Sequence, residues 1–411
     1  MNQKLLKNYA RLIVRVGANL RPGMKAVVTV AVDQKDLAAQ VVKECYACGA
    51  SAVRVEWYDE TVSRLHYLNQ ATEELASVAR WEKEKMRQTA QDLPCRIYID
   101  SDDPDAMKGI EQDKLQAVAR ARSKAFKPYR DAMDNKHAWV IAAAPSKAWA
   151  KKVFPKESPA KATEKLWAAI LDAVRVTEDN DPVAEWNKIN ESFRKRSQWL
   201  NDNAFTAMEY ESSNGTSFRA GLIPGVKWEG GGEFTLDGHY FNPNLPTEEI
   251  FTTPMRGVAE GTLVSTKPLS YHGQLIERFS ITFENGKAVR WQAEKGQAML
   301  DRLLSLDAGA KMLGELALVP KTSPIARSGL LYYNTLFDEN ASCHVALGEG
   351  FTNLYPGFET MTRKELTEKG INDSLTHVDF MIGADDLSVT GVRADGTRVP
   401  VFRNGTWADG V

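Results

Sequence analysis

The chain has 411 residues, of which 43% are hydrophobic and 26% are charged, and its formal net charge is −2. This near-neutral balance gives no electrostatic reason to expect nucleic acid or a membrane surface as a partner. A chain of this length exceeds one ordinary hydrophobic core, so we expect two domains.

Targeting signals are not expected. Lys and Arg interrupt the apolar pattern of residues 1–15, so this segment lacks the uninterrupted apolar core of a signal peptide. No apolar run approaches membrane-spanning length, and four cysteines in so long a chain do not make a disulfide framework. We therefore expect a cytoplasmic protein with no membrane partner.

Residues 1–200 are predicted to alternate between helix and strand. Helical periodicity runs from Leu5 to Val16, and the apolar, β-branched run Ala26–Val32 that follows is typical of a buried parallel strand. Further helices are expected at Asp36–Cys48, Lys165–Arg175 and Pro182–Leu200, and further strands at Ala52–Tyr58, Arg96–Asp100 and Ala138–Ala142. This order predicts an α/β N-terminal domain with a mainly parallel sheet over residues 1–200.

Residues 201–411 are predicted to be rich in strands and turns. Two hairpins are expected around 213–216 and 284–287, because the Asn-Gly pairs there tolerate positive φ. Their strands are Phe205–Glu211, Ser217–Leu222, Gln274–Phe283 and Ala288–Ala293. With a helical stretch near Gly296–Ser305, this half is expected to be an α+β domain.

The sequence His377-Val-Asp379 places two ligand-type residues two positions apart. On a strand both side chains would point to one face, and Val378 and Phe380 would point to the other. A His-x-Asp pattern alone is weak evidence for a metal site. It gains weight because a second histidine, His344, lies shortly before it in Glu339-Asn-Ala-Ser-Cys-His344.

Carboxylates recur upstream in similar settings. Glu249 begins Glu249-Ile-Phe-Thr-Thr-Pro254, and Glu315 lies in the apolar segment Leu313–Pro320, where Leu313, Glu315 and Ala317 would share one strand face. A charge among apolar neighbours requires a partner. Each residue alone is more simply a satisfied core or surface group, but together they form a ligand set that suits zinc, manganese, cobalt or magnesium.

Other motifs and ligand-type residues are expected to be structural. The chain contains no His-Glu-x-x-His, Gly-x-Ser-x-Gly or phosphate-binding loop pattern. Cys45-Tyr-Ala-Cys48 ends a helix and has no second cysteine pair, so buried structural cysteines are expected there. Cys343 is expected to point away from His344. The remaining histidines, which we expect to be ordinary polar or core residues, are His66, His137, His239 and His272.

Several long segments, in order along nearly the whole chain, resemble the aminopeptidase S and aminopeptidase T family. They are Pro246–Pro254, Ser265–Tyr271, Leu313–Pro320, Asn334–Ser342, His377–Gly383 and Asp395–Gly405. The resemblance implies a homodimeric exopeptidase that removes N-terminal amino acids from peptides. It also implies an α/β N-terminal domain followed by a metal-bearing C-terminal domain.

The resemblance further implies two divalent metal ions per chain, either Zn, Co, Mn or Mg. The metal ligands that it implies are Glu249, Glu315, Glu339, His344, His377 and Asp379. Glu315 is the expected general base, with Glu339 as the alternative, because the sequence does not say which carboxylate bridges the metals.

One position departs from the family pattern. Relatives typically carry a tyrosine seven residues after the histidine that corresponds to His344, whereas this chain has Phe351. If that hydroxyl stabilises an oxyanion, the nearby Tyr355 is a candidate to replace it. The alternative, that Tyr355 only packs the loop, is equally compatible with the sequence.

Two other classes of protein are compatible with part of the site. His344, His377 and Asp379 alone form the ligand set of a mononuclear non-haem Fe(II) oxygenase, and ring-cleaving dihydroxypyridine dioxygenases resemble the aminopeptidases distantly. A non-catalytic binding protein is the third possibility. The three additional glutamates argue against both, because neither an oxygenase with one metal nor a degenerate site needs them.

Overall fold

The structure is a computed structural model that describes residues 2–271 and 274–411. The chain forms two compact units: the first comprises Met1–Lys188 and Gly232–Leu245, and the second comprises Ile189–Gly231 and Pro246–Val411. Helix α9 (Pro182–Asp202) contains the division between them. The predicted boundary lies at residue 200, whereas the first unit ends at Lys188 and includes Gly232–Leu245, which returns to it.

The first unit contains a parallel sheet with the strand order β10-β4-β3-β1-β2. Its strands are β1 (Lys25–Ala31), β2 (Ala52–Tyr58), β3 (Cys95–Asp100), β4 (Trp139–Ala143) and β10 (Asn244–Leu245). A two-stranded ribbon, β8 (Glu233–Phe234) with β9 (Tyr240–Phe241), precedes β10. The predicted parallel sheet is therefore confirmed, and its edge strand β10 comes from the returning segment.

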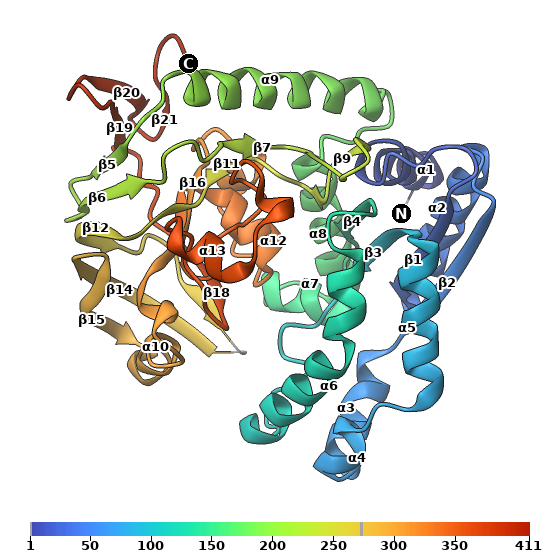
Figure 1. Ribbon diagram of the computed structural model, residues 1–411. Coiled ribbons are helices and arrows are strands. Elements are labelled where there is room, and N and C mark those ends of the chain that lie inside the picture. Colours follow the sequence, from blue (N-terminus) through green and yellow to red (C-terminus); the bar gives the residue numbers. More distant parts are fainter. Residues whose placement is uncertain (1, 272–273) are drawn as a thin grey trace. The chain divides into compact units, whose positions relative to one another are not determined.

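Helices precede, connect or follow the parallel strands of this unit, and those between β1, β2, β3 and β4 make the crossovers that βαβ units require. They are α1 (Gln3–Leu12), α2 (Lys35–Ala47), α3 (Glu60–Asn69), α4 (Thr72–Ala76), α5 (Arg80–Asp92), α6 (Gln112–Met133), α7 (Lys147–Val153) and α8 (Pro159–Ala173). Ser158 caps α8 by accepting from Lys161 N–H, and Pro159 occupies the first helical position. Helix α1 continues as a π-helical turn, Ile13–Gly17. In Figure 1, α3, α4 and α6 extend away from the sheet.

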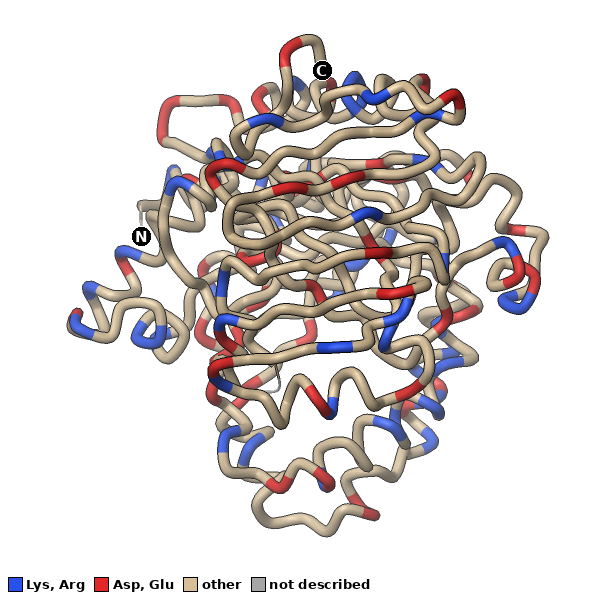
Figure 2. The backbone as a smooth tube through the Cα atoms, turned by 90° about the vertical axis from the view of Figure 1, so that its left-hand side faces the viewer, with Lys and Arg blue, Asp and Glu red and all other residues tan. Residues whose placement is uncertain are grey.

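The larger sheet of the second unit is antiparallel, with the order β13-β14-β12-β6-β5-β19-β20-β21 and β15 beside β14. Its strands are β5 (Ala207–Glu211), β6 (Ser217–Leu222), β12 (Pro254–Val264), β13 (Leu269–Tyr271), β14 (Gln274–Glu284), β15 (Lys287–Lys295), β19 (Ser388–Val392), β20 (Arg398–Arg403) and β21 (Thr406–Trp407). Acidic and basic residues are interspersed across this sheet (Figure 2), and pairs such as Arg219 with Glu209 lie on it.

A second antiparallel sheet has the order β18-β17-β16-β11-β7. It consists of β7 (Glu229–Gly230), β11 (Ile250–Thr252), β16 (Leu313–Leu318), β17 (His344–Gly348) and β18 (His377–Met381). The helices of this unit are α10 (Gln297–Leu304), α11 (Pro324–Ser328), α12 (Thr335–Asp338) and α13 (Arg363–Glu368). One face of this sheet packs into the main core of the unit.

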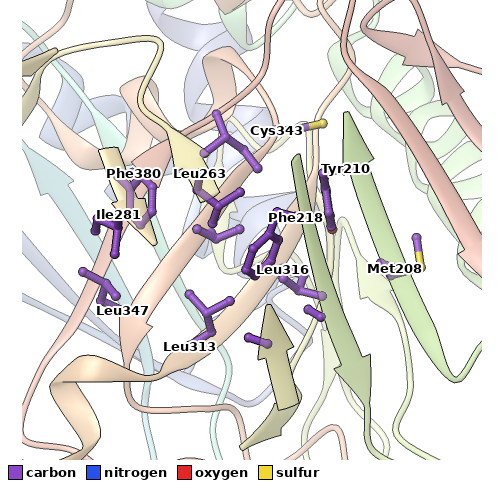
Figure 3. Close-up of a cluster of buried hydrophobic side chains, with 14 of the residues drawn as sticks. Met208, Tyr210, Phe218, Leu263, Ile281, Leu313, Leu316, Cys343, Leu347 and Phe380 are labelled. Carbon is purple, nitrogen blue, oxygen red and sulfur yellow. The ribbon is translucent and has the colours of Figure 1, made fainter. Parts of the chain in front are cut away.

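The core explains why these strands are so apolar. Val345 and Leu347 of β17 and Val378 and Phe380 of β18 are buried together with residues of the larger sheet, including Phe218 (Figure 3). Alternate residues of the same strands therefore point to the opposite face, which we call the site face. Among the described residues, no helix is both long and apolar enough to cross a membrane.

Candidate metal centre

The site face of β16, β17 and β18 carries most of the ligand-type residues that the sequence singled out. His377 and Asp379 lie on this face of β18, because Val378 and Phe380 point into the core, as the two-residue spacing predicted. His344 begins β17 on the same face. Its neighbour Cys343 is buried in the core (Figure 3), so the expectation that the two side chains point apart is confirmed.

The expectation that Leu313, Glu315 and Ala317 share one strand face is wrong at Leu313. Leu313 pairs with Leu347, but Glu315 already pairs with Ala346, so a β-bulge at Gly314 adds one residue to β16. The bulge turns Leu313 into the core and leaves Glu315 and Ala317 on the site face. A Cβ at Gly314 would lie 2.0 Å from the Glu349 carbonyl oxygen, which explains why glycine occupies this position.

The first ligand-type group, the His344 group, consists of Glu249, Glu315 and His344. His344 Nε2 lies 3.2 Å from Glu249 Oε2 and 4.0 Å from Glu315 Oε1. Glu249 directly precedes β11, and the His344 side chain is only 1% exposed. The structure therefore brings together residues that are up to 95 positions apart in the sequence (344 − 249).

The second group, the His377 group, consists of Glu315, His377 and Asp379. His377 Nε2 lies 3.1 Å from Glu315 Oε2 and 3.3 Å from Asp379 Oδ1. Asp379 Oδ1 is buried and receives no hydrogen bond from the described residues. The His377 side chain is 29% exposed, so this side of the site is the more open one. Glu315 belongs to both groups and presents one oxygen to each.

Backbone carbonyls orient both imidazole rings. His344 Nδ1 lies 3.2 Å from the Ser342 carbonyl oxygen, and His377 Nδ1 lies 2.7 Å from that of Glu349. A carbonyl only accepts, so each Nδ1 carries a proton and Nε2 faces the carboxylates. Nε2 donates to them while the ring is protonated, and its lone pair becomes available to a metal ion when the ring is neutral. Metal-binding histidines in proteins are typically held in this way. No sequence pattern predicts these two carbonyl contacts, because they depend on the backbone of the folded chain.

Burial and mutual repulsion perturb the acids of the site. Burial raises the pKa of Glu315 to about 7, and the hydrogen bond from His377 only partly offsets this effect. Burial opposes the charged form of His344, but its contact with Glu249 outweighs burial and raises its pKa to about 10. His377 shows the same balance, because the Asp379 and Glu315 carboxylates raise its pKa in spite of burial. The metal-free site therefore holds extra protons.

Glu339 belongs to neither group, but its carboxyl group interacts electrostatically with residues of both. Its carboxyl group is in the turn Glu339–Ala341, between α12 and β17. Burial raises the pKa of Glu339 well above its usual range, and the nearby Glu249 and Asp379 carboxylates raise it further. The structure thus places Glu339 beside the same site, as expected, but with fewer direct contacts.

Tyr355 and Phe351 have different surroundings. Tyr355 packs against a small apolar cluster of Ile223, Leu366 and Ile371. The Phe351 ring lies beside the site, with its centroid 5.1 Å from that of His377. The packing of Tyr355 agrees with the alternative in which it supports the loop, and its catalytic role stays a prediction.

The described histidines other than His344 and His377 belong to the first unit, as do Cys45 and Cys48. His66 contacts Gln70, His137 contacts the Met133 carbonyl, and the buried His239 contacts that of Ala18. His272 lies outside the described residues. Cys45 is buried and Cys48 is half-buried, and neither forms a disulfide.

The donor set fits divalent metal ions. Ligands that share one ion at roughly 2.0–2.2 Å lie roughly 3.0–3.5 Å from each other. Three of the four distances given above, 3.2, 3.1 and 3.3 Å, are in this range. Oxygen and imidazole donors without thiolates suit zinc, cobalt, manganese or magnesium. Asp379 Oδ1, which is buried and accepts no hydrogen bond from the described residues, also suits a metal ligand.

Known proteins are similar to this chain in sequence and in architecture. Residues 2–407 match the family described as thermophilic metalloprotease (M29). Aminopeptidase AmpS of Bacillus subtilis is 41% identical over 404 residues, which cover 98% of each chain. The solved structure of wild-type AmpT from Thermus thermophilus covers 98% of this chain and 99% of its own, with 36% identity and a TM-score of 0.91.

A more distant structure shares the fold alone. The 2,5-dihydroxypyridine dioxygenase from Pseudomonas putida KT2440 covers 99% of this chain and 97% of its own, with 13% identity and a TM-score of 0.50. The match to the family model and the identity with AmpS both extend over nearly the whole chain. The chain therefore belongs to the thermophilic metalloprotease (M29) family.

Proposed function

We propose that this protein is an aminopeptidase that holds two divalent metal ions and hydrolyses the first peptide bond of peptides with a free N-terminus. The single observation that carries the proposal is the position of Glu315 in both ligand groups, with Oε1 toward His344 and Oε2 toward His377. A carboxylate placed in this way is suited to bridge two cations.

The charge of the site supports two cations. Its four carboxyl groups carry four negative charges when ionised, and two divalent cations would balance them. Buried carboxylates of this density are otherwise expensive, since each needs a partner. Glu249 and Glu339 would complete the His344 group, and Asp379 would complete the His377 group.

When bound, the two cations would supply Lewis acidity and make a water molecule nucleophilic near neutral pH. The residues of the chain have distinct parts in the reaction. His344 and His377, fixed through their Nδ1–H groups, present Nε2 in one orientation. Glu315, with both oxygens engaged, is best suited to hold the geometry rather than to move a proton.

Proton transfer is best assigned to Glu339. Its carboxyl group lies near the same charged groups, and no contact with either histidine engages it as the contacts of Glu315 do. It would take the proton of the attacking water and later give it to the leaving amine. A free α-amino group would pair with a site carboxylate, which explains the restriction to chain ends.

The finer features of the proposal follow from the family resemblance. The second unit, Ile189–Gly231 with Pro246–Val411, would be the catalytic, metal-binding domain, and the first unit would be the N-terminal domain. The active molecule would be a homodimer in the cytoplasm. Zinc, cobalt, manganese and magnesium are the candidate metals.

An iron-dependent ring-cleaving dioxygenase is the weaker alternative. The dioxygenase with this fold is only 13% identical to the chain. Glu249 and Glu315 both lie against His344, and an oxygenase with one metal has no use for these carboxylates.

The direct test is a panel of aminoacyl-chromophore substrates with metal-stripped protein that is re-supplied with individual cations. We expect release of the chromophore only after a divalent cation is added. N-terminally acetylated substrates are the matched control and are expected to remain intact. Ring cleavage of a dihydroxypyridine with Fe(II) and no peptide hydrolysis would overturn the proposal.

A further inference from the structure

Asn340, the residue after Glu339, is fully buried, and each polar group of its side chain is engaged. Its Oδ1 accepts from the Glu248 backbone N–H at 2.7 Å. Its Nδ2 donates to the Leu336 carbonyl at 2.9 Å and lies 3.5 Å from Glu339 Oε1. Its own carbonyl accepts from Ser323 Oγ at 3.0 Å.

These bonds connect two segments that supply carboxylates to the site. Glu248 is adjacent to Glu249, whose Oε2 lies 3.2 Å from His344 Nε2. Leu336 and Glu339 belong to the helical turns that carry the second carboxylate. The segments are about 90 residues apart in the sequence, and the amide of Asn340 is a direct polar link between them. It therefore fixes the separation of Glu249 from Glu339.

The His377 group is supported by different bonds. His377 Nδ1 is held by the Glu349 carbonyl, and the neighbouring Gly348 carbonyl accepts from Asn372 Nδ2. Asp379 lies on β18, whose pairing with β17 sets its position. Asn340 takes part in none of these bonds, so a change at Asn340 acts first on the His344 side.

We propose that Asn340 is a positioning residue that sets the metal affinity of the His344 group and leaves that of the His377 group unchanged. The inference rests on the proposed two-metal function. The amide is suited to this task because it offers an acceptor to Glu248 and donors to Leu336 and Glu339 without adding charge. Aspartate keeps the acceptor but loses the donors, and leucine keeps the shape but loses both.

The test is the metal affinity of Asn340→Leu, measured by zinc titration of the full chain after chelation. We expect one zinc ion to bind with wild-type affinity and the second to bind about 10–100-fold more weakly, the usual cost of losing a residue that orients a ligand. Imidazole NMR signals identify the weakened site, and that of His344, not His377, is expected to stay in its metal-free position at limiting zinc.

Asn201→Leu is the matched control. The Asn201 amide also joins two backbone groups, those of Trp228 at 2.8 and 3.1 Å, in the same unit, but it is not part of the ligand groups. This variant is expected to bind two zinc ions as the wild type does. Asn340→Ala, a smaller neutral change, serves as the second variant at the proposed position.

Each outcome is decisive. Wild-type affinity at both sites in a folded Asn340 variant, or equal weakening of both sites, would overturn the inference. If both Asn340 variants stay unfolded at saturating zinc, Asn340 is a determinant of the fold and the inference is again wrong. A wild-type protein that binds fewer than two zinc ions would instead contradict the proposed function, so the two failures are distinguishable.

Discussion

Glu339 and Glu315 differ in what each can do as a single residue. Glu315 is engaged on both oxygens, whereas Glu339 has a strongly raised pKa and fewer partners. We therefore expect Glu339→Gln to lower kcat by about 10²–10⁴-fold, the usual effect of removing a general acid–base group. Metal content is expected to fall much less than in Glu315→Gln, which would weaken both sites.

The measurement is kcat together with metal content for both variants, with the exposed Glu359→Gln as the control. Wild-type turnover in Glu339→Gln would remove this residue from proton transfer. If Glu315→Gln instead kept both metals and lost turnover, the role of general base would return to Glu315.

Tyr355 and Phe351 are a second comparison at the scale of single residues. If the Tyr355 hydroxyl stabilises the oxyanion, Tyr355→Phe should lower kcat on the order of 10²–10³-fold without loss of metal. If Tyr355 only supports the loop through its packing against Ile223 and Leu366, Tyr355→Phe should instead leave kcat unchanged. If Tyr355→Phe leaves kcat unchanged and Phe351→Tyr raises it, the hydroxyl that favours turnover belongs at position 351, beside His377.

At the scale of the element, the bulge in β16 determines where Glu315 points. Gly314→Ala would put a Cβ against the Glu349 and Gly348 carbonyl oxygens, at 2.0 and 2.6 Å. We expect the free energy of unfolding to fall by about 1–3 kcal/mol, the usual cost of overpacking. Zinc affinity should fall at both groups, because Glu315 belongs to both.

Denaturant unfolding of the metal-free protein and zinc titration measure the two effects. Gly109→Ala is a useful control, because a Cβ there meets no atom within 4 Å, although its positive φ carries a cost of its own. Unchanged zinc affinity in Gly314→Ala would show that the bulge does not set the position of Glu315.

The local sequence pattern predicted many helices and strands, but it failed where pairing with another strand determines the structure. Strand β2 has the predicted bounds, Ala52–Tyr58, because its apolar run is bounded by turn residues. Alternation placed His377 and Asp379 on one face, because period 2 is a local property of a strand. The bulge at Gly314 was missed, since the pairing of β16 with β17 creates it.

Long-range contacts explain the other omissions. Strand β10 has two residues and forms only by pairing with β4, from which it is about 100 residues distant, so no local signal marks it. Asn340 was missed for the same reason, because its partner Glu248 lies 92 residues away. The full set of six candidate ligands was implied by a resemblance over the whole chain, which carries such long-range information, and it stays a prediction.

At the scale of the whole molecule, the metal-free protein is expected to lose stability as the pH rises. The pKa of His344 is about 10 in the folded protein against an ordinary 6.5, so its contribution is complete below pH 6.5 and is lost as the pH rises through 10. The pKa of Glu315 rises from 4.5 to about 7, so its deprotonation destabilises the fold between these values. Both effects have the same sign.

Metal ions compete with these protons, so zinc should bind more tightly as the pH rises toward 10. We expect the increase in Tm on adding zinc to be larger at pH 9 than at pH 6, and binding to release protons into the buffer. Thermal unfolding and calorimetry in buffers of different ionisation enthalpy measure these effects. If the increase in Tm on adding zinc is the same at both pH values, His344 is not protonated in the metal-free protein as we expect.

The most direct test of the central claim is a titration of verified metal-free protein with one divalent cation, while metal content and release of an N-terminal residue are followed together. Two ions should bind per chain, and peptide hydrolysis should reach its plateau only when the second site fills. Full activity without metal, or with one ion per chain, would contradict the two-metal account.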